Sequence, residues 1–425
     1  MRISVSKSEV SGTVRAPASK SYTIRGLMCS ALAQGDSEIL APLSSDDTEA
    51  ALNVIRAIGV NITREVSTKE GKLWRVTGGS FHEPKGDLFC GDSAATLRFM
   101  AAICSLVPGE SRLTAGPSLA QRTVGPLVAA LQQLGVGCSA QGGLPPLVVR
   151  GCGLKGGLTE LPGNISSQFV SALLLVAPLA KQGVSIRLTT ASESKPYLLM
   201  TLDCLKTFGI DVDASPDLRE FRVSPQVYKP ARYLVEGDWS SASYFLALGA
   251  LSGPVAVANL NPESLQGDRA LLGFLKDMGA QIGIDKNTIT VRKSRLNALK
   301  ADLADVIDLL PTVAALAAVA SGTSEFTGIE RARIKESNRV AAVRRGLERM
   351  GIRVREERNR LLITGATPKG AVIDSRNDHR IAMAFGVLGT VAGGTVINEA
   401  ECTSKTFPDF WEVLRSIGGE VKKNG

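Results

Sequence analysis

One helix-ending pattern recurs six times along this chain and limits the folds that it can adopt. Each copy has apolar residues at helical spacing, then a glycine, then alternating apolar residues, which is typical of a helix, a left-handed stop and a strand. The copies lie about 70 residues apart, as expected for repeated structural units. Their glycines are Gly59, Gly135, Gly209, Gly279, Gly351 and Gly418. Six units account for the whole length of 425 residues.

A second pattern also occurs six times, out of phase with the first. A polar cluster rich in Ser or Asp, whose side-chain oxygens make good helix N-caps, precedes a run of small apolar residues. The copies are SKSYTIRGLMCSALA, GDSAATLRFMAAICSL, NISSQFVSALLLVAP, GDWSSASYFLALGAL, IDLLPTVAALAAVAS and NDHRIAMAFGVLGTV. Helices that are apolar nearly all round are buried, so we expect them inside a shell of sheets.

These patterns predict six copies of a strand–helix–strand–helix–strand unit, three in each of two similar lobes. The segment PARYLVEGDWSS (230–241) is a plausible crossover between lobes, since a new unit starts after it. The longest apolar runs, 172–180 and 313–320, are far shorter than the ~20 residues that span a bilayer. The opening residues MRISVSKSEV read as a strand and lack the apolar run of a signal peptide. We therefore expect a cytoplasmic protein without a membrane span.

Cysteine, histidine and charge patterns exclude several classes of site. The seven cysteines are irregularly spaced without a CxxC pair, which favours reduced, mostly buried thiols over disulfides or a zinc site. The only histidines are His82 and His379, so a His-rich metal site lacks ligands. The net charge is +8, but the one dense basic segment, 331–360, is interspersed with acidic residues. It is either a solvated helix face or part of a pocket for a small polyanion.

Lysine and arginine residues recur near the predicted caps. Any one of these residues is most simply a solvated side chain. Their recurrence at the same position within the repeated unit, next to the caps, instead indicates an anion site. Helix N-termini attract anions, and Arg suits bidentate contact with phosphate or carboxylate. The cations near the caps are Lys20, Arg25, Arg98, Lys195, Lys335, Arg339, Arg380 and Lys405, and Arg122 lies in the loop AGPSLAQRTVG.

Eight motifs in order resemble those of the 5-enolpyruvylshikimate-3-phosphate (EPSP) synthase family, within the enolpyruvyl transferases. They are PASKSYTIR, GDSAATLR, SSQFVSALL, SKPY, EGDWSSASYF, IKESNR, NDHRIAMAF and CTSKTFPDF. The resemblance covers essentially the whole chain. It implies a two-lobed inverse α/β barrel with six βαβαβ-type repeats, three per lobe, closing over the substrates. Lobe one would be residues 1–16 plus 236–425, on the phosphoenolpyruvate (PEP) side, and the inserted lobe two would be 17–235, on the shikimate 3-phosphate side.

The resemblance also implies an activity in the shikimate pathway of aromatic amino-acid biosynthesis. The enolpyruvyl group of PEP would pass to the 5-hydroxyl of shikimate 3-phosphate with release of phosphate. Asp308 would take the 5-hydroxyl proton, Glu336 would protonate the methylene carbon of PEP, and Lys20 would lie between both ligands. Two carboxyl groups in different environments can serve as acid and base. Glu336 lies between Lys335 and Arg339, which alone would favour its ionised form, and the anionic groups of PEP would supply opposing charge.

The remaining site residues follow from the same resemblance, with no metal ion or cofactor required. We expect a monomer that binds these two metabolites and neither nucleic acid nor membrane. Shikimate 3-phosphate would be held by Lys20, Ser21, Arg25, Ser166, Ser167, Gln168, Ser194, Tyr197, Asp308 and Lys335. PEP would be held by Lys20, Ala94, Arg122, Gln168, Arg339, Arg380 and Lys405.

The second motif departs from the family pattern. Asp92-Ser93-Ala94-Ala95 stands where the family commonly has Asn-Ala/Ser-Gly-Thr. Asp92 adds a negative charge near the expected PEP position, and the Ala94 methyl replaces a glycine that lets glyphosate fit closely. We therefore expect weak inhibition by glyphosate. Gln121, Thr123 and Asn338 also depart from the commonest family residues, but none is assigned to chemistry.

Two alternatives remain at this point. UDP-N-acetylglucosamine enolpyruvyl transferases share the PEP chemistry, but they open with Lys-Asn and carry a reactive Cys before the conserved Arg. This chain has Lys20-Ser21 and no Cys in AGPSLAQR. An RNA-binding protein should show aromatic stacking platforms on a basic surface, and no aromatic-basic motif occurs. His379 is either a proton shuttle or a neutral residue that orients its neighbours.

Overall fold

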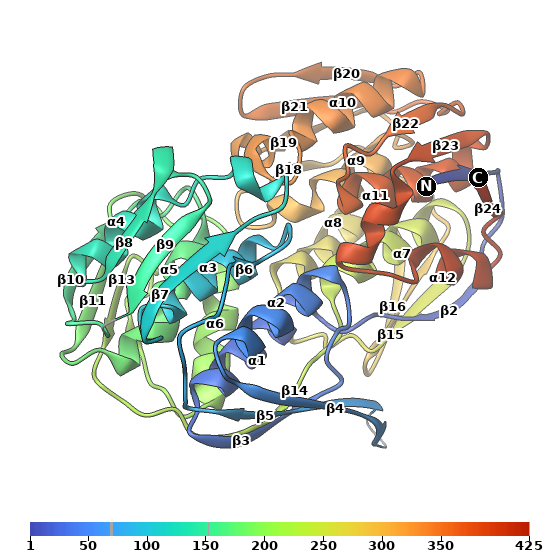
Figure 1. The fold of residues 1–425 in the computed structure, drawn as a ribbon. Helices are drawn as coiled ribbons and strands as arrows, with labels where there is room; N and C mark the ends of the chain where they lie inside the picture. Colours follow the sequence, from blue (N-terminus) through green and yellow to red (C-terminus); the bar gives the residue numbers. More distant parts are fainter. Residues whose placement is uncertain (69–70, 152, 425) are drawn as a thin grey trace. The chain divides into compact units, whose positions relative to one another are not determined.

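The computed structural model describes residues 1–68, 71–151 and 153–424. The chain forms two compact units: unit 1 comprises Met1–Pro17 and Gly237–Gly425, and unit 2 comprises Ala18–Glu236. In Figure 1, unit 2 runs from blue through green, and unit 1 contains the yellow-to-red part together with the blue N-terminal strands. Both ends of the chain therefore belong to unit 1.

One repeat of unit 2 illustrates the architecture of all six. It runs β-α-β-α-β-β, and its sheet has the order β10-β11-β13-β12. The first two strands pair in parallel, and the other two join antiparallel. Its elements are β10 (Gly157–Leu161), α5 (Ser167–Val176), η3 (Ala177–Leu179), β11 (Val184–Leu188), α6 (Lys195–Thr207), β12 (Asp213–Ala214) and β13 (Glu220–Val223).

The other sheets of unit 2 have the orders β14-β3-β5-β4 and β6-β7-β9-β8, with the same pairing pattern. Their strands are β3 (Gly35–Leu40), β4 (Asn61–Thr68), β5 (Gly71–Gly78), β6 (Leu88–Phe89), β7 (Gly109–Thr114), β8 (Gly137–Ala140), β9 (Leu147–Gly151) and β14 (Arg232–Leu234). Short 3₁₀ turns, η1 (Leu119–Gln121) and η2 (Gln141–Gly143), lie in the loops.

The described part of unit 1 contains three further sheets, with the orders β16-β17-β15-β2, β18-β19-β21-β20 and β22-β23-β1-β24. Their strands are β1 (Arg2–Val5), β2 (Gly12–Arg15), β15 (Val255–Ala258), β16 (Gln281–Asp285), β17 (Thr288–Arg292), β18 (Lys300–Asp302), β19 (Thr323–Thr327), β20 (Arg353–Glu356), β21 (Arg360–Thr364), β22 (Val372–Asp374), β23 (Thr395–Asn398) and β24 (Val421–Asn424). The N-terminal strand β1 pairs with the C-terminal strand β24, so the two chain ends lie side by side (Figure 1). The sheets confirm the α/β class, but each repeat has a fourth strand that the sequence patterns did not predict.

The chain passes between the units twice, each time directly after an edge strand. Strand β2 of unit 1 is followed by α1 (Lys20–Leu32) of unit 2, and β14 of unit 2 is followed by α7 (Trp239–Leu251) of unit 1. Within unit 2, the Ser19 N–H donates to the Glu236 carbonyl at 2.8 Å. Within unit 1, the Asp238 N–H donates to the Pro17 carbonyl at 2.8 Å. These bonds fix the backbone at the starts of two buried helices.

The inner helices of each unit are buried nearly all round, as predicted. They are α1, α3 (Ala94–Ile103) and α5 in unit 2, and α7, α9 (Leu310–Ala317) and α11 (His379–Ala392) in unit 1. The apolar side chains of the two units form two separate cores. Burying their small apolar residues is the main stabilising contribution, because each buried CH₂ contributes about 0.8 kcal/mol.

The outer helices end at the repeated glycines, which confirms the pattern that organised the sequence. They are α2 (Asp46–Ala57), α4 (Gly125–Gln133), α6, α8 (Leu271–Asp277), α10 (Arg339–Arg349) and α12 (Phe410–Ser416). The six glycines have φ between +77° and +107°, a conformation that L side chains rarely adopt.

Four of the six predicted helix caps are observed. Ser19, Ser166, Asp238 and Asp378 each accept a backbone N–H of the first turn of their helix. Ser93 stands at the cap of α3 but makes no side-chain cap hydrogen bond. Helix α9 instead follows the 3₁₀ turn η5 (Ile307–Leu309), and Leu309 stands at its cap. The prediction of a polar cap for this helix is therefore wrong, because Asp308 pairs with cations instead.

None of the described helices is both long and apolar enough to cross a membrane. Among the described residues the cysteines are free thiols, all buried, as predicted. Cys152 lies outside the described residues.

Candidate functional site

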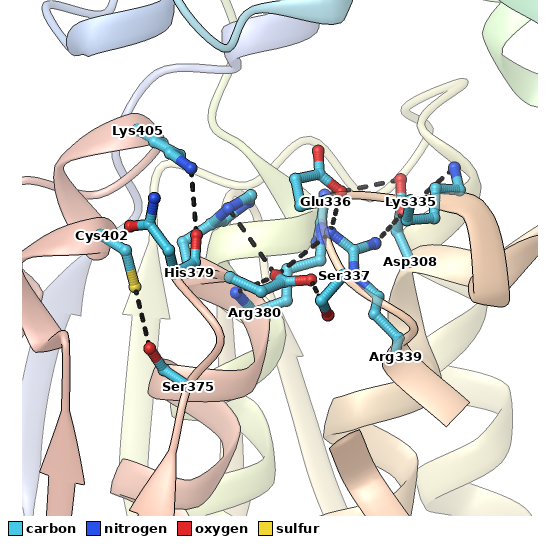
Figure 2. Close-up of polar contacts among 12 residues, drawn as sticks. Asp308, Lys335, Glu336, Ser337, Arg339, Ser375, His379, Arg380, Cys402 and Lys405 are labelled. Carbon is cyan, nitrogen blue, oxygen red and sulfur yellow. Dashed lines mark hydrogen bonds and ion pairs between the residues drawn. The ribbon is translucent and has the colours of Figure 1, made fainter. Parts of the chain in front are cut away.

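A buried arginine organises the charged cluster of unit 1 (Figure 2). The Arg339 side chain is 1% exposed and begins helix α10. Its Nη1 lies 2.7 Å from Asp308 Oδ1, its Nη2 lies 2.5 Å from Glu336 Oε2, and its Nε lies 2.8 Å from Asp378 Oδ2. Burial alone would lower the pKa of the guanidinium, but the three carboxylates raise it above its usual value. Arg339 therefore remains charged and fixes three acidic side chains.

Asp308 lies among three cations. Besides Arg339, Lys335 Nζ lies 3.5 Å from its Oδ1 and Arg380 Nη2 lies 3.5 Å from its Oδ2. Nearby positive charges favour the ionised carboxylate, which is the form that accepts a proton. Asp308 is therefore a carboxylate that three cations hold in place.

Lys335 and Glu336 follow directly after the 3₁₀ turn η6 (Glu330–Ile334), and Figure 2 shows both beside Arg339. The turn is held by Asn359, whose Oδ1 accepts the N–H groups of Ile329 and Glu330 at 2.8 and 3.1 Å. Burial lowers the pKa of Lys335 to about 8, although Asp308 opposes the shift. Lys335 therefore titrates close to physiological pH.

Arg380 joins a second buried acid to this cluster. Its Nη2 donates to Ser240 Oγ at 3.3 Å, and the Ser240 hydroxyl donates to Asp268 Oδ2. Burial raises the pKa of Asp268 to about 7, against the lowering effect of Arg380. Arg380 therefore lies between two carboxyl groups, Asp268 and Asp308.

The remaining residues of the cluster lie at the start of α11 and in η7 (Ala400–Lys405). Lys405 Nζ donates to the Asn377 carbonyl at 3.0 Å, and Asp378 accepts the Arg380 N–H at 3.0 Å. His379 is buried, with Nδ1 3.9 Å from Asp378 Oδ1. Cys402 packs against Ser375, and burial raises its pKa to about 12, so it is no reactive thiolate at neutral pH.

In unit 2, Lys20 pairs with an acid that the sequence analysis did not single out. Lys20 is the first residue of α1, and its Nζ lies 2.8 Å from Asp47 Oδ2 in α2. The Asp47 carbonyl accepts the Thr96 hydroxyl at 3.4 Å, which links the pair to the first turn of α3. Lys20 is therefore held in place by an ion pair with Asp47.

Arg25 connects α1 to α6. Its Nε donates to Thr201 Oγ1 at 2.8 Å, and its Nη atoms donate to the carbonyls of Ser21 and Tyr197, each at 3.1 Å. Burial lowers the pKa of its guanidinium. Tyr197 lies in the first turn of α6, and Ser194 is the N-cap of the same helix. Ser194 is buried and has a left-handed φ of +57°. A left-handed conformation in a residue other than glycine is strained, and such strain clusters at ligand sites.

Arg98 connects α3 to α5. Its Nη1 donates to Ser166 Oγ at 3.1 Å and to Gln168 Oε1 at 2.7 Å, and its Nη2 donates to the Thr123 carbonyl at 3.4 Å. Ser167 is buried in the first turn of α5. Arg98 therefore orders the predicted Ser-Ser-Gln segment and the residue after Arg122.

Ala94 and Arg122 lie next to the Asp92 turn. Ala94 is the first residue of α3 and is buried, and Arg122 follows η1 as a half-buried residue. Asp92 Oδ1 accepts the N–H groups of Ser118 and Leu119 at 3.1 and 3.0 Å. The unexpected carboxylate therefore bonds the backbone of the loop that carries Arg122.

The predicted site residues are thus divided between the two units. Unit 1 holds Asp308, Lys335, Glu336, Arg339, Arg380 and Lys405, and unit 2 holds Lys20, Ser21, Arg25, Ala94, Arg122, Ser166, Ser167, Gln168, Ser194 and Tyr197. The sequence analysis missed the residues that hold these side chains, notably Asp47, Asp268 and Asp378. Asp378 stands in the NDHRIAMAF motif and could have been found there, but nothing near Asp268 marks it.

Across the described ranges, no group of three or more His, Cys, Asp or Glu side chains is placed to hold a metal ion.

Comparison with known proteins agrees with this architecture. The chain matches the EPSP synthase (3-phosphoshikimate 1-carboxyvinyltransferase) family over residues 5–414. A 3-phosphoshikimate 1-carboxyvinyltransferase of Dehalococcoides mccartyi is 51% identical over 424 residues, covering 100% of both chains. One from Methanothermobacter thermautotrophicus is 41% identical, covering 98% of this chain and 99% of the relative. The solved EPSP synthase of Acinetobacter baumannii has a TM-score of 0.82 at 25% identity, covering 99% of this chain and 100% of that one.

The six repeats and this solved structure define a two-lobed α/β fold, which confirms the predicted fold class. The chain belongs to the EPSP synthase family of enzymes. The resemblance inferred from the eight motifs is thereby confirmed. The names of the relatives do not favour the UDP-N-acetylglucosamine alternative.

Proposed function

We propose that the protein transfers the enolpyruvyl group of PEP to the 5-hydroxyl of shikimate 3-phosphate and releases phosphate. The observation that carries this proposal, together with family membership, is the buried contact of Arg339 with Asp308, Glu336 and Asp378. It brings a candidate base and a candidate acid to one guanidinium that suits an anionic substrate. Residues 1–16 plus 236–425 would form the PEP side and residues 17–235 the shikimate 3-phosphate side.

The residue assignments that the family resemblance implies are part of this proposal. Shikimate 3-phosphate would be bound by Lys20, Ser21, Arg25, Ser166, Ser167, Gln168, Ser194, Tyr197, Asp308 and Lys335. PEP would be bound by Lys20, Ala94, Arg122, Gln168, Arg339, Arg380 and Lys405. The buried serines and arginines support these roles, because charge-assisted hydrogen bonds to phosphate are the strong ones.

The proposed reaction is an addition followed by an elimination. Asp308 takes the proton of the 5-hydroxyl as its oxygen attacks C2 of PEP, while Glu336 gives a proton to C3. Loss of one proton from the new methyl group and of phosphate from C2 then restores the double bond. Basic side chains stabilise the charge that develops on the phosphate, which is the kind of preorganised electrostatic effect that dominates many enzymes. No metal ion or organic cofactor takes part in this scheme.

The contacts of Glu336 support a route to its protonated form. Without ligand, its carboxylate pairs with Arg339 Nη2 at 2.5 Å, which favours ionisation. An anionic group of PEP bound to Arg339 would replace that partner and add a negative charge nearby. Both effects favour the neutral carboxyl, so PEP binding would promote protonation of Glu336.

The proposal also includes a monomer that works in the cytoplasm and binds no nucleic acid.

Phosphate release tests the proposed function. The purified protein should release phosphate from PEP when shikimate 3-phosphate is present, and should give no release with UDP-N-acetylglucosamine. Release with the sugar nucleotide alone would favour the alternative transferase, and release with neither acceptor would overturn both.

The ionisation of Lys335 predicts a pH dependence. Its lowered pKa of about 8 means that the free enzyme loses this positive charge as pH rises through 8. kcat/KM for shikimate 3-phosphate should therefore fall above pH 8, by up to about ten-fold per pH unit, since only the charged form attracts phosphate. In Lys335→Arg the guanidinium stays charged, so this decline should move to higher pH. An unchanged profile in that variant would remove Lys335 from the phosphate contact.

The Ala94 methyl predicts weak inhibition by glyphosate. Ala94 is 7% exposed at the start of α3, so little space remains around its side chain. Ala94→Gly removes one methyl and should lower the glyphosate concentration for half inhibition at least about ten-fold, since relief of overpacking is typically worth 1–3 kcal/mol. Competition against PEP measures the effect. Equal sensitivity of both proteins would show that Ala94 does not limit the inhibitor.

A further inference from the structure

The turn before α3 is bonded to the loop that carries Arg122. Asp92 Oδ1 accepts two backbone N–H groups at the start of η1, from Ser118 at 3.1 Å and from Leu119 at 3.0 Å. We propose that Asp92 is a positioning residue that holds Arg122 for PEP through the backbone of residues 116–122. This inference rests on the proposed function, because it takes Arg122 as a PEP ligand.

A chain of backbone bonds leads from the turn to Arg122. The Gly116 N–H donates to the Gly91 carbonyl at 2.7 Å, and the Ala120 N–H donates to the Gly116 carbonyl at 2.9 Å. The Arg122 N–H then donates to the Leu119 carbonyl at 3.0 Å. Displacing the start of η1 would therefore displace the backbone of Arg122 as well.

The loop and the carboxylate approach each other too closely for a side chain. A Cβ atom added to Gly116 would lie 2.7 Å from Asp92 Oδ1 and 3.0 Å from its Cγ. Real Cβ contacts are almost never this short, so either the loop or Asp92 would have to move. Gly116 therefore offers a second way to disturb the same contact without changing any charge.

The two N–H donors also explain how a carboxylate is tolerated close to a proposed anion site. Both N–H groups direct their positive ends at Oδ1, which offsets part of the negative charge of the carboxylate. An Asn side chain has the same shape and offers one carbonyl oxygen to both donors. Asp92→Asn should therefore keep the loop in place while removing the negative charge.

The effect should be selective for PEP. The proposed shikimate 3-phosphate residues Ser21, Arg25 and Tyr197 belong to α1 and α6, and Arg25 is held there by Thr201. Loss of the Asp92 contact moves Arg122 but leaves these bonds in place. The KM for PEP is thus expected to change without a parallel change in the KM for shikimate 3-phosphate.

Steady-state kinetics of four variants tests the proposal. Asp92→Ala and Gly116→Ala should raise the KM for PEP about ten-fold or more, because a charged acceptor of two hydrogen bonds is lost or displaced. Asp92→Asn should stay within about three-fold of wild type, or bind PEP more tightly because a negative charge is gone. Gly125→Ala is the matched control, because its added Cβ would meet its nearest neighbours at an ordinary 3.6 Å. It should leave both KM values unchanged.

Amide hydrogen exchange provides a readout that needs no substrate. In Asp92→Ala the Ser118 and Leu119 amides should exchange faster, while Asp92→Asn should protect them as wild type does. The proposal would be overturned if the wild-type protein turns over and Asp92→Ala has the same kinetic constants and amide exchange rates as wild type. It would also be overturned if both KM values rise in parallel in Asp92→Ala. If Asp92→Ala does not fold, Gly116→Ala gives the same decision. A wild-type protein without turnover would instead overturn the proposed function, and the exchange rates would still decide whether Asp92 holds the loop.

Discussion

Replacing Glu336 by Gln should lower kcat about 10²–10⁴-fold, because Gln keeps the shape of the side chain but has no acidic proton to give. The amide oxygen can still accept the bond from Arg339 Nη2, which Glu336 accepts at 2.5 Å. The KM values for PEP and shikimate 3-phosphate should therefore change much less than kcat. Phosphate release under saturating substrates measures the effect.

A matched control for this substitution lies on the same segment. Glu330 precedes Glu336 by six residues and pairs with Arg358 at 2.8 Å, but its side chain is 53% exposed. Glu330→Gln should leave kcat within about two-fold of wild type, since exposed pairs contribute little. In D₂O the wild-type product should carry deuterium on its methylene carbon, and the little product formed by Glu336→Gln should accumulate far more slowly. A kcat near wild type in Glu336→Gln would assign the acid to another group.

The large-scale organisation could be predicted because it rests on local chemistry. A helix that stops at a left-handed glycine, or starts at a Ser or Asp cap, marks its own ends in the sequence. Six such stops, at Gly59 and its counterparts, were enough to count the repeats. The fourth strand of each sheet, such as β5 or β13, escaped prediction because the two repeated patterns mark the ends of helices and give no signal for a strand that follows another strand.

Side chains that act through distant contacts were harder to predict. Asp268 meets Ser240 across 28 residues of chain, and Asp47 meets Lys20 across 27. Neither pair has a spacing that indicates contact, since only the packing of separate helices brings them together. Asp92 was misjudged for the same reason, because its two backbone donors, Ser118 and Leu119, lie in a distant segment. From the sequence alone, its charge is unfavourable near an anion site.

The cluster of unit 1 has a charge balance that suits ligand exchange. Lys335, Arg339 and Arg380 all contact Asp308, and the ionised carboxylates satisfy these cations while no substrate is bound. Buried charges need such partners, because a charge that loses its partner is strongly destabilising. An anionic substrate that replaces one carboxylate restores the balance and frees that carboxylate to carry a proton.

Arg339→Met should cost about 3–5 kcal/mol of unfolding free energy at neutral pH, because it leaves buried carboxylates without their shared cation. Three acids lose a partner at once, and the Asp378 side chain is fully buried. Without the guanidinium, these carboxyl groups should bind protons more readily in the folded protein than in the unfolded one. The deficit should therefore shrink as pH falls from 7.5 toward 5, since stability then rises with proton uptake by the folded state. Urea unfolding of variant and wild type at both pH values measures it.

Arg344→Met provides the surface comparison. Arg344 also contacts two carboxylates, Glu348 and Glu356, each at 2.7 Å, but its side chain is 30% exposed. Its loss should cost about 1 kcal/mol or less, with little dependence on pH, because water replaces the guanidinium around exposed acids. Arg339→Met should in addition abolish measurable PEP turnover, whereas Arg344→Met should retain it. Equal stability losses in the two variants, or a deficit for Arg339→Met that stays constant between the two pH values, would mean that the three acids do not depend on Arg339 for their charge.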